Sequence, residues 1–493
     1  MPATDPQSVK EKATAFVVFG ATGDLSRKKI FPSFFELFKT NLLPEKFKII
    51  AAARSAYSNK EFTQSLKENI EADDKNLWRK FSDLIEYIQC DVESGKNINL
   101  LSQRLEDLEK TNKVCTQRIF YMAVSPFIYG KAFENLGKYK LNLGCLNHQK
   151  LARIVTEKPF GFNFQSAHNL NEILNKYFDE SQIFRIDHFL GKETVQNIFA
   201  FRFGNEIFEP IWNRNFVDNV QITLAERIGI EKRGESYDKM GALRDVVQNH
   251  LLQLLTIVTM DEPTTFSRDS IRHKKIEILK AIRPFSKDDV INNTIRGQYN
   301  GYQQEANVAK NSKTDTFALV KLFIENGRWQ GVPFYLRTGK KLTGAVTSII
   351  LQFKEHGHEL FKNFQQKPIP NHITLQIQPD EGIGISLVAK KPGLATVLEP
   401  VDMEFCYKKS FDVPQPNAYE RLLMDIILGD QTLFLGRIGN SWKIIDPIEK
   451  VWQKGNPKLE VYEQGSWGPQ AADKLIAADG RQWLAPLLTI CKI

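Results

Sequence analysis

Residues 15–25 read AFVVFGATGDL and indicate how the chain begins to fold. The apolar run AFVVF has the length of a buried strand, and the pattern from about Leu25 to Lys39 has helical spacing. Glycines between the two elements let the backbone turn tightly and approach a pyrophosphate, which the N–H groups of the helix N-terminus would bind. The GxxG spacing also suits a plain turn. We predict a phosphate-binding turn made of Gly20, Ala21, Thr22, Gly23, Asp24 and Leu25.

Strand-like and helical patterns continue to alternate through the first third of the chain. Further strand-like runs at 48–55, 118–126 and 151–161 are separated by helical patterns. Strands that alternate with helices favour a parallel sheet covered on both faces. We therefore predict an α/β domain of Rossmann type, with a doubly wound parallel sheet, over residues 1–185.

Beyond residue 185 the pattern changes. Strand-like runs occur at 217–226, 316–325, 347–353 and 371–378, several of them alternating between apolar and polar residues. A long helical stretch covers about 241–260, and no internal repeat or flexible linker is visible. We predict an α+β domain over residues 186–493, with helices and a large, mainly antiparallel sheet.

The composition is that of a soluble globular protein. The chain has 493 residues, 42% of them hydrophobic and 25% charged, and its net charge of +8 comes without a long Lys/Arg run. A nucleic-acid partner is therefore not expected. The N-terminus lacks an apolar signal segment, and no stretch has the length and hydropathy of a membrane span, so we expect a cytoplasmic protein without a membrane partner.

The cysteines do not form a recognisable metal motif. They number five, are widely spaced and include no CxxC pair; they stand at positions 90, 115, 145, 406 and 491. An odd, scattered set favours neither a disulfide scaffold nor a zinc site. We expect buried reduced thiols and no bound metal.

The end of the second predicted strand bears on the choice of cofactor. An acid after this strand usually binds the ribose 2′-hydroxyl of NAD, whereas an arginine suits the 2′-phosphate of NADP. Here the run KIIAAARS ends in Arg54 and Ser55 with no acid. The pattern favours NADP, although an arginine after a strand is also a common surface residue and could tolerate both cofactors.

Residues 185–193, RIDHFLGKE, place an acid and a histidine side by side. If this segment is helical, Asp187 and His188 point about 100° apart and serve different targets. His188 and Lys192, four residues apart, would then converge on one anion, while Phe189 and Leu190 anchor the segment in a core. A solvated charged face is the alternative interpretation.

Residues 244–253, RDVVQNHLLQ, contain a second polar cluster in an apolar helical pattern. A single histidine in such a helix is most often a satisfied core residue. His250, however, is accompanied by Asp245 and by neighbouring amides, and burying these groups costs free energy unless they find partners. A polar ligand such as a sugar would satisfy them.

Several segments together resemble the glucose-6-phosphate dehydrogenase family. The segments are GATGDL, EKPFG at 157–161, RIDHFLGKE, RDVVQNHLLQ, GVPFYLRTGKKL at 331–342, YERLLMD at 419–425 and GSWGP at 465–469. They follow the family's order over almost the whole chain and are most similar to bacterial members. The resemblance implies oxidation of glucose 6-phosphate at C1 to 6-phosphoglucono-1,5-lactone with hydride transfer to NADP⁺, the first step of the oxidative pentose phosphate pathway.

The resemblance also implies roles for individual residues. His250 would be the general base, and Asp187 would orient it and stabilise the imidazolium. His188 and Lys192 would bind the sugar phosphate. The remaining substrate residues would be Glu226, Asp245, Lys340 and Lys158, the last of which would also contact the cofactor. Because Pro159 follows Lys158, that peptide bond could be cis.

The chain departs from the family at two points. Phe189 stands where the family usually has tyrosine, and TGAVT follows GKKL, where some members have another arginine near 345. Either change could remove a contact with the substrate phosphate. Family members are dimers or tetramers, so we expect a homodimer or homotetramer.

Two other functions remain open from the residues alone. An oxidoreductase of an unphosphorylated sugar would use a similar fold but would not need His188 or Lys192. A non-catalytic NADP-binding regulator could use the same glycine turn, and His250 and Asp187 would then be structural.

Overall fold

The computed structural model describes residues 9–71, 74–145, 152–355, 370–411, 416–436 and 439–485. Its backbone divides into two compact units. The first contains residues 1–191, 264–272 and 416–439, and the second contains the remainder. Residues 264–272 and 416–439 thus belong to the first unit, although the sequence pattern placed everything after residue 185 in the second domain. The domain boundary itself stays a prediction.

The first unit is built on a six-stranded parallel sheet in the order β3-β2-β1-β4-β5-β6. Its strands are β1 (Thr14–Phe19), β2 (Phe47–Ala53), β3 (Ile85–Gln89), β4 (Gln117–Met122), β5 (Ala152–Thr156) and β6 (Ile183–Arg185). The order reverses between β1 and β4, as in a doubly wound sheet. This confirms the predicted fold class and the four predicted strands; β3 and β6 were not predicted.

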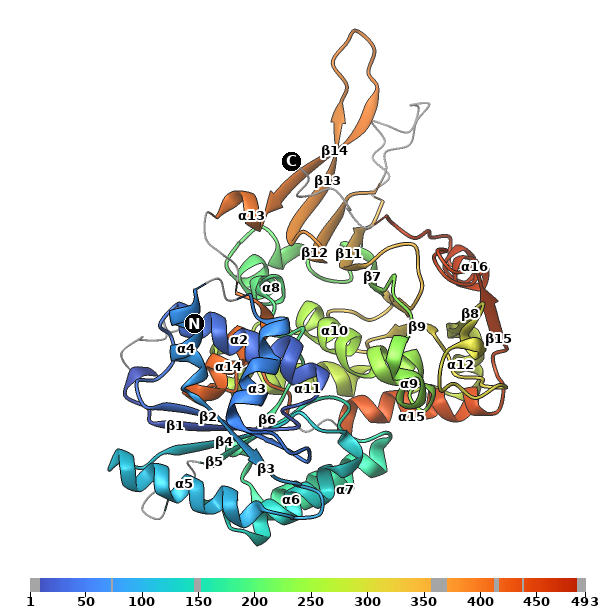
Figure 1. Cartoon of the computed structure of the whole chain (residues 1–493). Coiled ribbons are helices and arrows are strands. Elements are labelled where there is room, and N and C mark those ends of the chain that lie inside the picture. The colour runs from blue at the N-terminus through green and yellow to red at the C-terminus, as the bar shows by residue number, and fades with distance from the viewer. Residues whose placement is uncertain are drawn as a thin grey trace. The chain divides into compact units, whose positions relative to one another are not determined.

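Helices cover both faces of this sheet (Figure 1). They are η1 (Ser26–Ile30), α2 (Phe31–Lys39), α3 (Asn59–Leu66), α4 (Lys75–Ser82), α5 (Ile98–Asn112), α6 (Tyr129–Lys138), α7 (Phe164–Tyr177) and α14 (Ala418–Leu428). Helices α5, α6 and α7 lie on one face and α2 and α14 on the other (Figure 1). The central strand β1 and its neighbour β2 are almost wholly apolar and buried, because a parallel sheet is covered on both sides.

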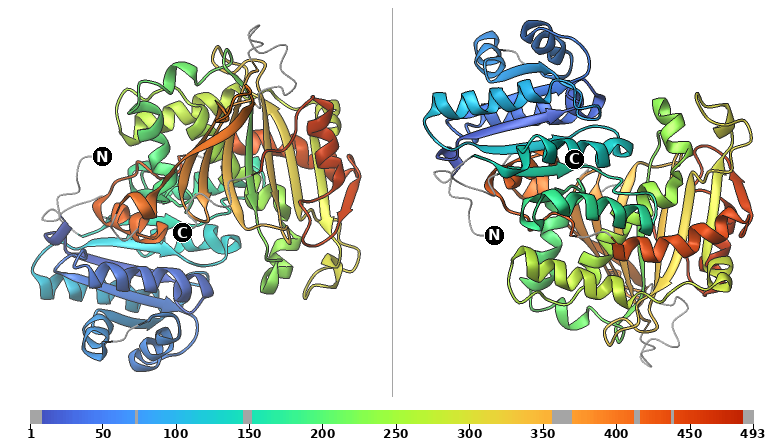
Figure 2. Two further views of the ribbon diagram at one scale, coloured as in Figure 1. Left: turned by 90° about the horizontal axis from the view of Figure 1, so that it is seen from above. Right: turned by 90° about the horizontal axis from the view of Figure 1, so that it is seen from below.

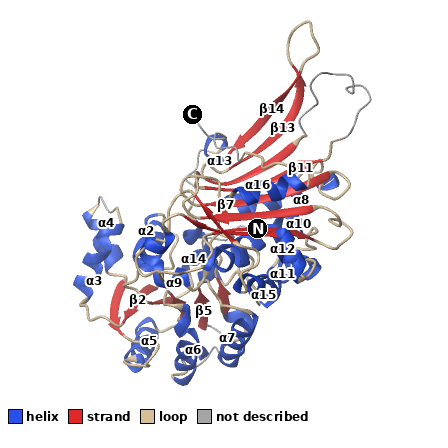
Figure 3. Cartoon of the chain, turned by 90° about the vertical axis from the view of Figure 1, so that its right-hand side faces the viewer, coloured by secondary structure: helices blue, strands red, loops and turns tan. Residues whose placement is uncertain are grey.

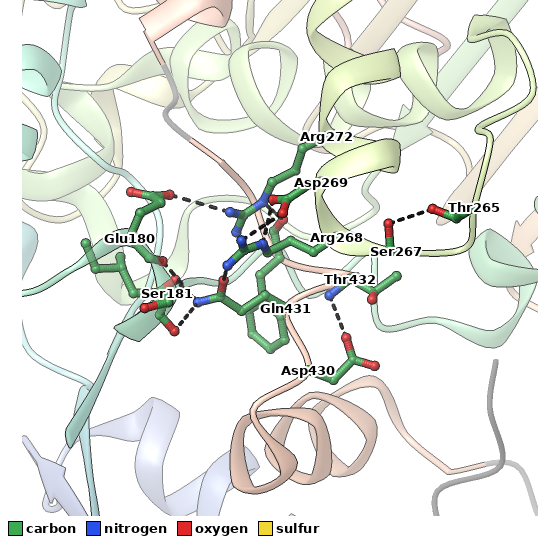
Figure 4. Close-up of polar contacts among 12 residues, drawn as sticks. Glu180, Ser181, Thr265, Ser267, Arg268, Asp269, Arg272, Asp430, Gln431 and Thr432 are labelled. Carbon is green, nitrogen blue, oxygen red and sulfur yellow. Dashed lines mark hydrogen bonds and ion pairs between the residues drawn. The ribbon is translucent and has the colours of Figure 1, made fainter. Parts of the chain in front are cut away.

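A polar network holds the two late segments in the first unit (Figure 4). Gln431 is 3% exposed, and its amide donates to the carbonyls of Glu180, Ser181 and Ile183. The same side chain accepts a hydrogen bond of 2.8 Å from Arg268. These bonds satisfy backbone carbonyls around the start of β6, so they explain why segments distant in sequence join this unit.

The second unit is built on a nine-stranded, mainly antiparallel sheet in the order β14-β13-β12-β11-β7-β10-β9-β8-β15. Its strands are β7 (Val217–Ala225), β8 (Thr294–Tyr299), β9 (Phe317–Phe323), β10 (Pro333–Gly339), β11 (Val346–Phe353), β12 (His372–Gln378), β13 (Gly382–Lys390), β14 (Leu398–Cys406) and β15 (Leu459–Tyr462). Figure 2 shows its strands side by side. The four strands predicted here are confirmed, and the others were not recognised in the sequence.

Helices pack against this sheet (Figure 2). At the β14 edge, strands β13 and β14 extend as a hairpin (Figure 3). The helices are α8 (Glu193–Phe203), α9 (Gly234–Asp238), η8 (Leu243–Leu251), α10 (Leu252–Thr259), α11 (Arg268–Ala281), which begins in the first unit, α12 (Lys287–Asn293), α13 (Tyr407–Ser410), α15 (Gly439–Gln453) and α16 (Gln470–Ala478). The predicted helix at 241–260 is therefore present. Its first part, η8, is a π-helix, which periodicity did not predict.

The expectation of reduced thiols is wrong for three cysteines, because Cys406 is disulfide-bonded as well as Cys115 and Cys145. Cys115 and Cys145 form a disulfide with a Cα–Cα separation of 5.8 Å. They precede the neighbouring parallel strands β4 and β5, whose N-terminal ends lie together, so residues 30 apart in sequence can meet. Cys90 is a buried free thiol, as expected, and Cys491 lies outside the described residues.

Candidate active site

The glycine turn after β1 is shaped by close backbone packing. Gly20 has a φ of +78°, and a Cβ added there would lie 2.2 Å from the carbonyl oxygen of Ala123. Its N–H donates to Ala52 at 2.9 Å, and the N–H of Gly23 donates to the carbonyl of Gly20 at 2.9 Å. Only glycine fits this position, because both the backbone angle and the space exclude a side chain.

A pocket of about 290 Å³ opens at the carboxyl ends of β1 to β4. Five predicted cofactor residues line it: Gly20, Thr22, Gly23, Arg54 and Ser55. The predicted residues Ala21, Asp24, Leu25 and Lys158 are not among the lining residues. The position agrees with the rule that ligands of doubly wound sheets bind where the strand order reverses.

The charged residues of this pocket are one cation beside β2 and two acids after β3. Arg54 is the one cation among the lining residues that the structure describes. The lining acids Asp91 and Glu93 follow β3, and the Asp91 carboxylate accepts bonds from the Glu93 N–H at 3.0 Å and the Ser94 hydroxyl at 2.8 Å. Asp91 is thus committed to its own loop. Neither acid was predicted from the sequence, because β3 was not recognised there.

The RIDHFLGKE segment is a turn rather than a helix. After β6, the N–H of Leu190 donates to Asp187 and that of Gly191 to His188, while α8 begins only at Glu193. The helix considered for this segment is therefore wrong. Two successive turns set the directions of its side chains instead. Phe189 and Leu190 are 5% and 2% exposed, as expected for residues that anchor the segment.

Asp187 and His188 are held within the first unit. Asp187 is 1% exposed, and its Oδ1 accepts the N–H of Phe189 at 3.0 Å. The ring of His188 stacks on Tyr419 of α14, with centroids 6.1 Å apart and planes 10° from parallel. The late segment 416–439 thus helps to position a predicted phosphate-binding residue.

Glu157 is a candidate that sequence reasoning passed over. It follows β5, and its carboxylate accepts bonds from the hydroxyls of Tyr121 at 2.5 Å and Tyr419 at 3.4 Å. Burial raises the pKa of Glu157 to about 7 against the opposing effect of these bonds. Its place in EKPFG, beside Lys158, was the available signal. The Lys158–Pro159 peptide bond is cis, as considered above.

Three predicted substrate residues meet in the second unit. Strands β7 and β10 run parallel with Ala225 opposite Gly339, so the next residues, Glu226 and Lys340, lie together at the carboxyl ends. They form an ion pair, and the ammonium group of Lys340 lies 4.0 Å from the Asp245 carboxylate. The Lys340 side chain is 2% exposed, against 27% for Glu226 and 16% for Asp245.

The helix that carries Asp245 also carries His250. Both lie in the π-helical segment η8, where His250 is 2% exposed. A π-helix advances its side chains differently from an α-helix, and such segments are frequent at functional sites. Elsewhere in this unit, Lys192 precedes α8 and donates to the side-chain oxygen of Gln378, at the end of β12.

Two family models match adjoining parts of the chain. One, described as the NAD binding domain of glucose-6-phosphate dehydrogenase, matches residues 17–197; the other, described as the C-terminal domain of the same enzyme, matches residues 199–484. The chain belongs to the glucose-6-phosphate dehydrogenase family.

Individual family members match over nearly their whole length. The chain is 41% identical to the glucose-6-phosphate 1-dehydrogenase of Chlamydia pneumoniae, covering 95% of each sequence. It is 37% identical to that of Bacillus subtilis (strain 168), covering 96% of this chain and 99% of the relative. A solved glucose-6-phosphate dehydrogenase in complex with glucose 6-phosphate matches with a TM-score of 0.88 and 33% identity, over 96% and 99% of the chains. The predicted family is confirmed.

Proposed function

We propose that this chain oxidises C1 of glucose 6-phosphate to the lactone and transfers the hydride to NADP⁺. The two family models and the full-length relatives confirm the predicted activity and cofactor. The observation in the structure that carries the proposal is the meeting of Glu226, Lys340 and Asp245 next to strand ends in one unit. A buried lysine held between two carboxylates offers both donors and acceptors, which suits the hydroxyls of a sugar.

The residues of the first unit fit NADP. The backbone at Gly20 leaves no room for a side chain, and Arg54 supplies a positive charge beside the end of β2. Gly20, Ala21, Thr22, Gly23, Asp24 and Leu25 would hold the pyrophosphate, with Arg54 and Ser55 at the 2′-phosphate and Lys158 nearer the nicotinamide. When bound, NADP⁺ accepts the hydride that leaves C1.

His250 would take the proton from the C1 hydroxyl as the hydride leaves. A neutral imidazole is suited to this step near neutral pH, and Asp187 would fix its tautomer and stabilise the imidazolium. His188 and Lys192 would bind the phosphate, which is remote from C1, so their contribution is to position the sugar for the reaction.

The deciding experiment measures NADPH formation by near-ultraviolet absorbance with glucose 6-phosphate or glucose, and with NADP⁺ or NAD⁺. We expect strong turnover with the phosphorylated sugar and higher kcat/KM with NADP⁺. The variants His188→Gln and Lys192→Gln should raise KM for glucose 6-phosphate. Turnover with glucose that neither substitution changes would indicate an enzyme of unphosphorylated sugars. No turnover with any pair of sugar and cofactor would indicate a cofactor-binding regulator.

We further propose a homodimer or homotetramer. Strand β14 is an edge of the nine-stranded sheet, and with β13 it exposes Leu387, Val401 and Met403, with exposed fractions of 39%, 44% and 61%. An edge strand with exposed apolar side chains favours association with another copy. Light scattering coupled to size-exclusion chromatography tests this: Met403→Lys with Val401→Lys should shift the mass toward the monomer.

We also propose a cytoplasmic location. Among the described residues, no helix is long and apolar enough to cross a membrane. Both partners of the proposed reaction are small phosphorylated metabolites, which supports this location. Cell fractionation followed by the NADPH assay would test it, and activity confined to the membrane fraction would contradict it.

A further inference from the structure

The second unit contains a cavity that none of the predicted site residues line. Its volume is about 420 Å³, within the range of small-molecule sites. The walls come from the start of η8, from β8, from the loop before β9 and from the end of α15. Of these segments, η8 also carries Asp245 and His250 of the proposed reaction, but neither residue lines the cavity.

Positive charge predominates in this cavity. Its lining contains the cations Arg244, Arg296, Lys313 and Lys454 and the acids Asp315 and Glu449. Both acids already have partners: Asp315 accepts the N–H of Leu243 at 2.8 Å, and Glu449 lies 3.5 Å from Arg244. The excess of cations remains for a ligand, and both lysines are exposed.

Arg296 is the buried cation of this cavity. Its side chain is only 6% exposed, and one terminal nitrogen donates to the carbonyl of Trp452. Its Nε is buried and has no hydrogen-bond partner among the described residues. An unsatisfied N–H of a buried guanidinium costs free energy, and an anion in the cavity would lie against the same guanidinium group.

We propose that this cavity binds a small multivalent anion of the phosphate-ester or polyphosphate class. Guanidinium groups match phosphate oxygens in geometry and charge, and Arg296 supplies one from the wall of the cavity. Lys313 and Lys454 add charge as flexible cations. The proposal does not depend on the proposed enzymatic function.

Inorganic pyrophosphate is the probe, and isothermal titration calorimetry on the full chain is the measurement. Saturating NADP⁺ and the Lys192→Gln background separate this cavity from the proposed cofactor and substrate-phosphate residues. We expect saturable binding that weakens about tenfold or more when Lys313→Gln and Lys454→Gln are combined, since two like charges are lost. Lys310→Gln, an exposed lysine outside the lining, is the matched control.

Arg296→Lys provides a second test, because it keeps the charge but removes the guanidinium. We expect it also to weaken binding, and its melting temperature reports whether it folds. The proposal is overturned if pyrophosphate shows no saturable binding to the parent. It is equally overturned if the lysine pair and the Lys310 control bind with the same affinity, which does not depend on the folding of the Arg296 variant.

Discussion

His250 is the residue on which the proposed chemistry depends most. It is 2% exposed on a helix that also carries Asp245, one of the proposed substrate residues. We expect His250→Asn to lower kcat by about two to four orders of magnitude, the usual contribution of a general base. Stopped-flow or steady-state NADPH formation measures this.

The matched control for that variant is His273→Asn, because His273 is 76% exposed on α11. Its kcat and KM should equal those of the parent, and both variants should keep the parent's melting temperature. Near-native turnover by His250→Asn would show that another group accepts the proton.

Glu157 makes stability depend on pH. Burial raises the pKa of its carboxyl group to about 7 in the folded state, from an ordinary value of 4.5. The folded protein therefore binds more protons between these values, so the stabilisation from this group is full below about pH 4.5 and is lost as pH rises through 7. The loss is of the order of 3 kcal/mol.

The variant Glu157→Gln should remove this pH dependence of stability, because glutamine does not titrate. Its side-chain oxygen can still accept hydrogen bonds from the two tyrosine hydroxyls. Urea unfolding at about pH 5.5 and pH 8 measures the difference. We expect the variant to gain stability over the parent at the higher pH. Glu172→Gln, an exposed acid on α7, is the control; equal pH slopes for the parent and Glu157→Gln would contradict the prediction.

At the scale of elements, the β1 turn depends on a close approach of two backbones. A Cβ at Gly20 would lie 2.2 Å from a carbonyl oxygen of the loop after β4. We expect Gly20→Ala to weaken NADP⁺ binding at least about tenfold, because the turn must move away from β4 to relieve the clash. Fluorescence titration gives the Kd.

Gly331→Ala is a matched control for this change. Gly331 has a φ of +84°, close to that of Gly20, but a Cβ there would meet nothing within 4 Å. It therefore carries the backbone strain without the clash. If both variants bind NADP⁺ as the parent does, the turn does not hold the pyrophosphate.

At the scale of the whole chain, Gln431 ties a late segment to the first unit. We expect Gln431→Leu to destabilise the protein by about 2–4 kcal/mol, since it leaves three carbonyls and Arg268 without this partner. Urea unfolding followed by circular dichroism measures the change. Gln165→Leu, exposed on α7, should be nearly neutral. Equal stability of the two variants would show that other contacts hold the segment.

Strands with a regular sequence pattern were recognised, and strands without one were missed. Strands β1, β2, β4 and β5 are apolar runs next to clear helical patterns, so they were recognised. By contrast, β3 alternates in burial as IEYIQ and β6 has only three residues, and neither has a distinctive pattern. The acids that follow β3 were missed for the same reason.

The sequence by itself determined the family, the doubly wound sheet, the glycine turn and the identity of the candidate site residues, because these depend on local periodicity and on short motifs. Only the tertiary structure decided that Glu226, Lys340 and Asp245 meet, that RIDHFLGKE is a turn, that η8 is a π-helix and that residues 264–272 and 416–439 join the first unit. The physical reason is that strand register, side-chain burial and long-range hydrogen bonds arise between segments far apart in the chain, and no local pattern records them.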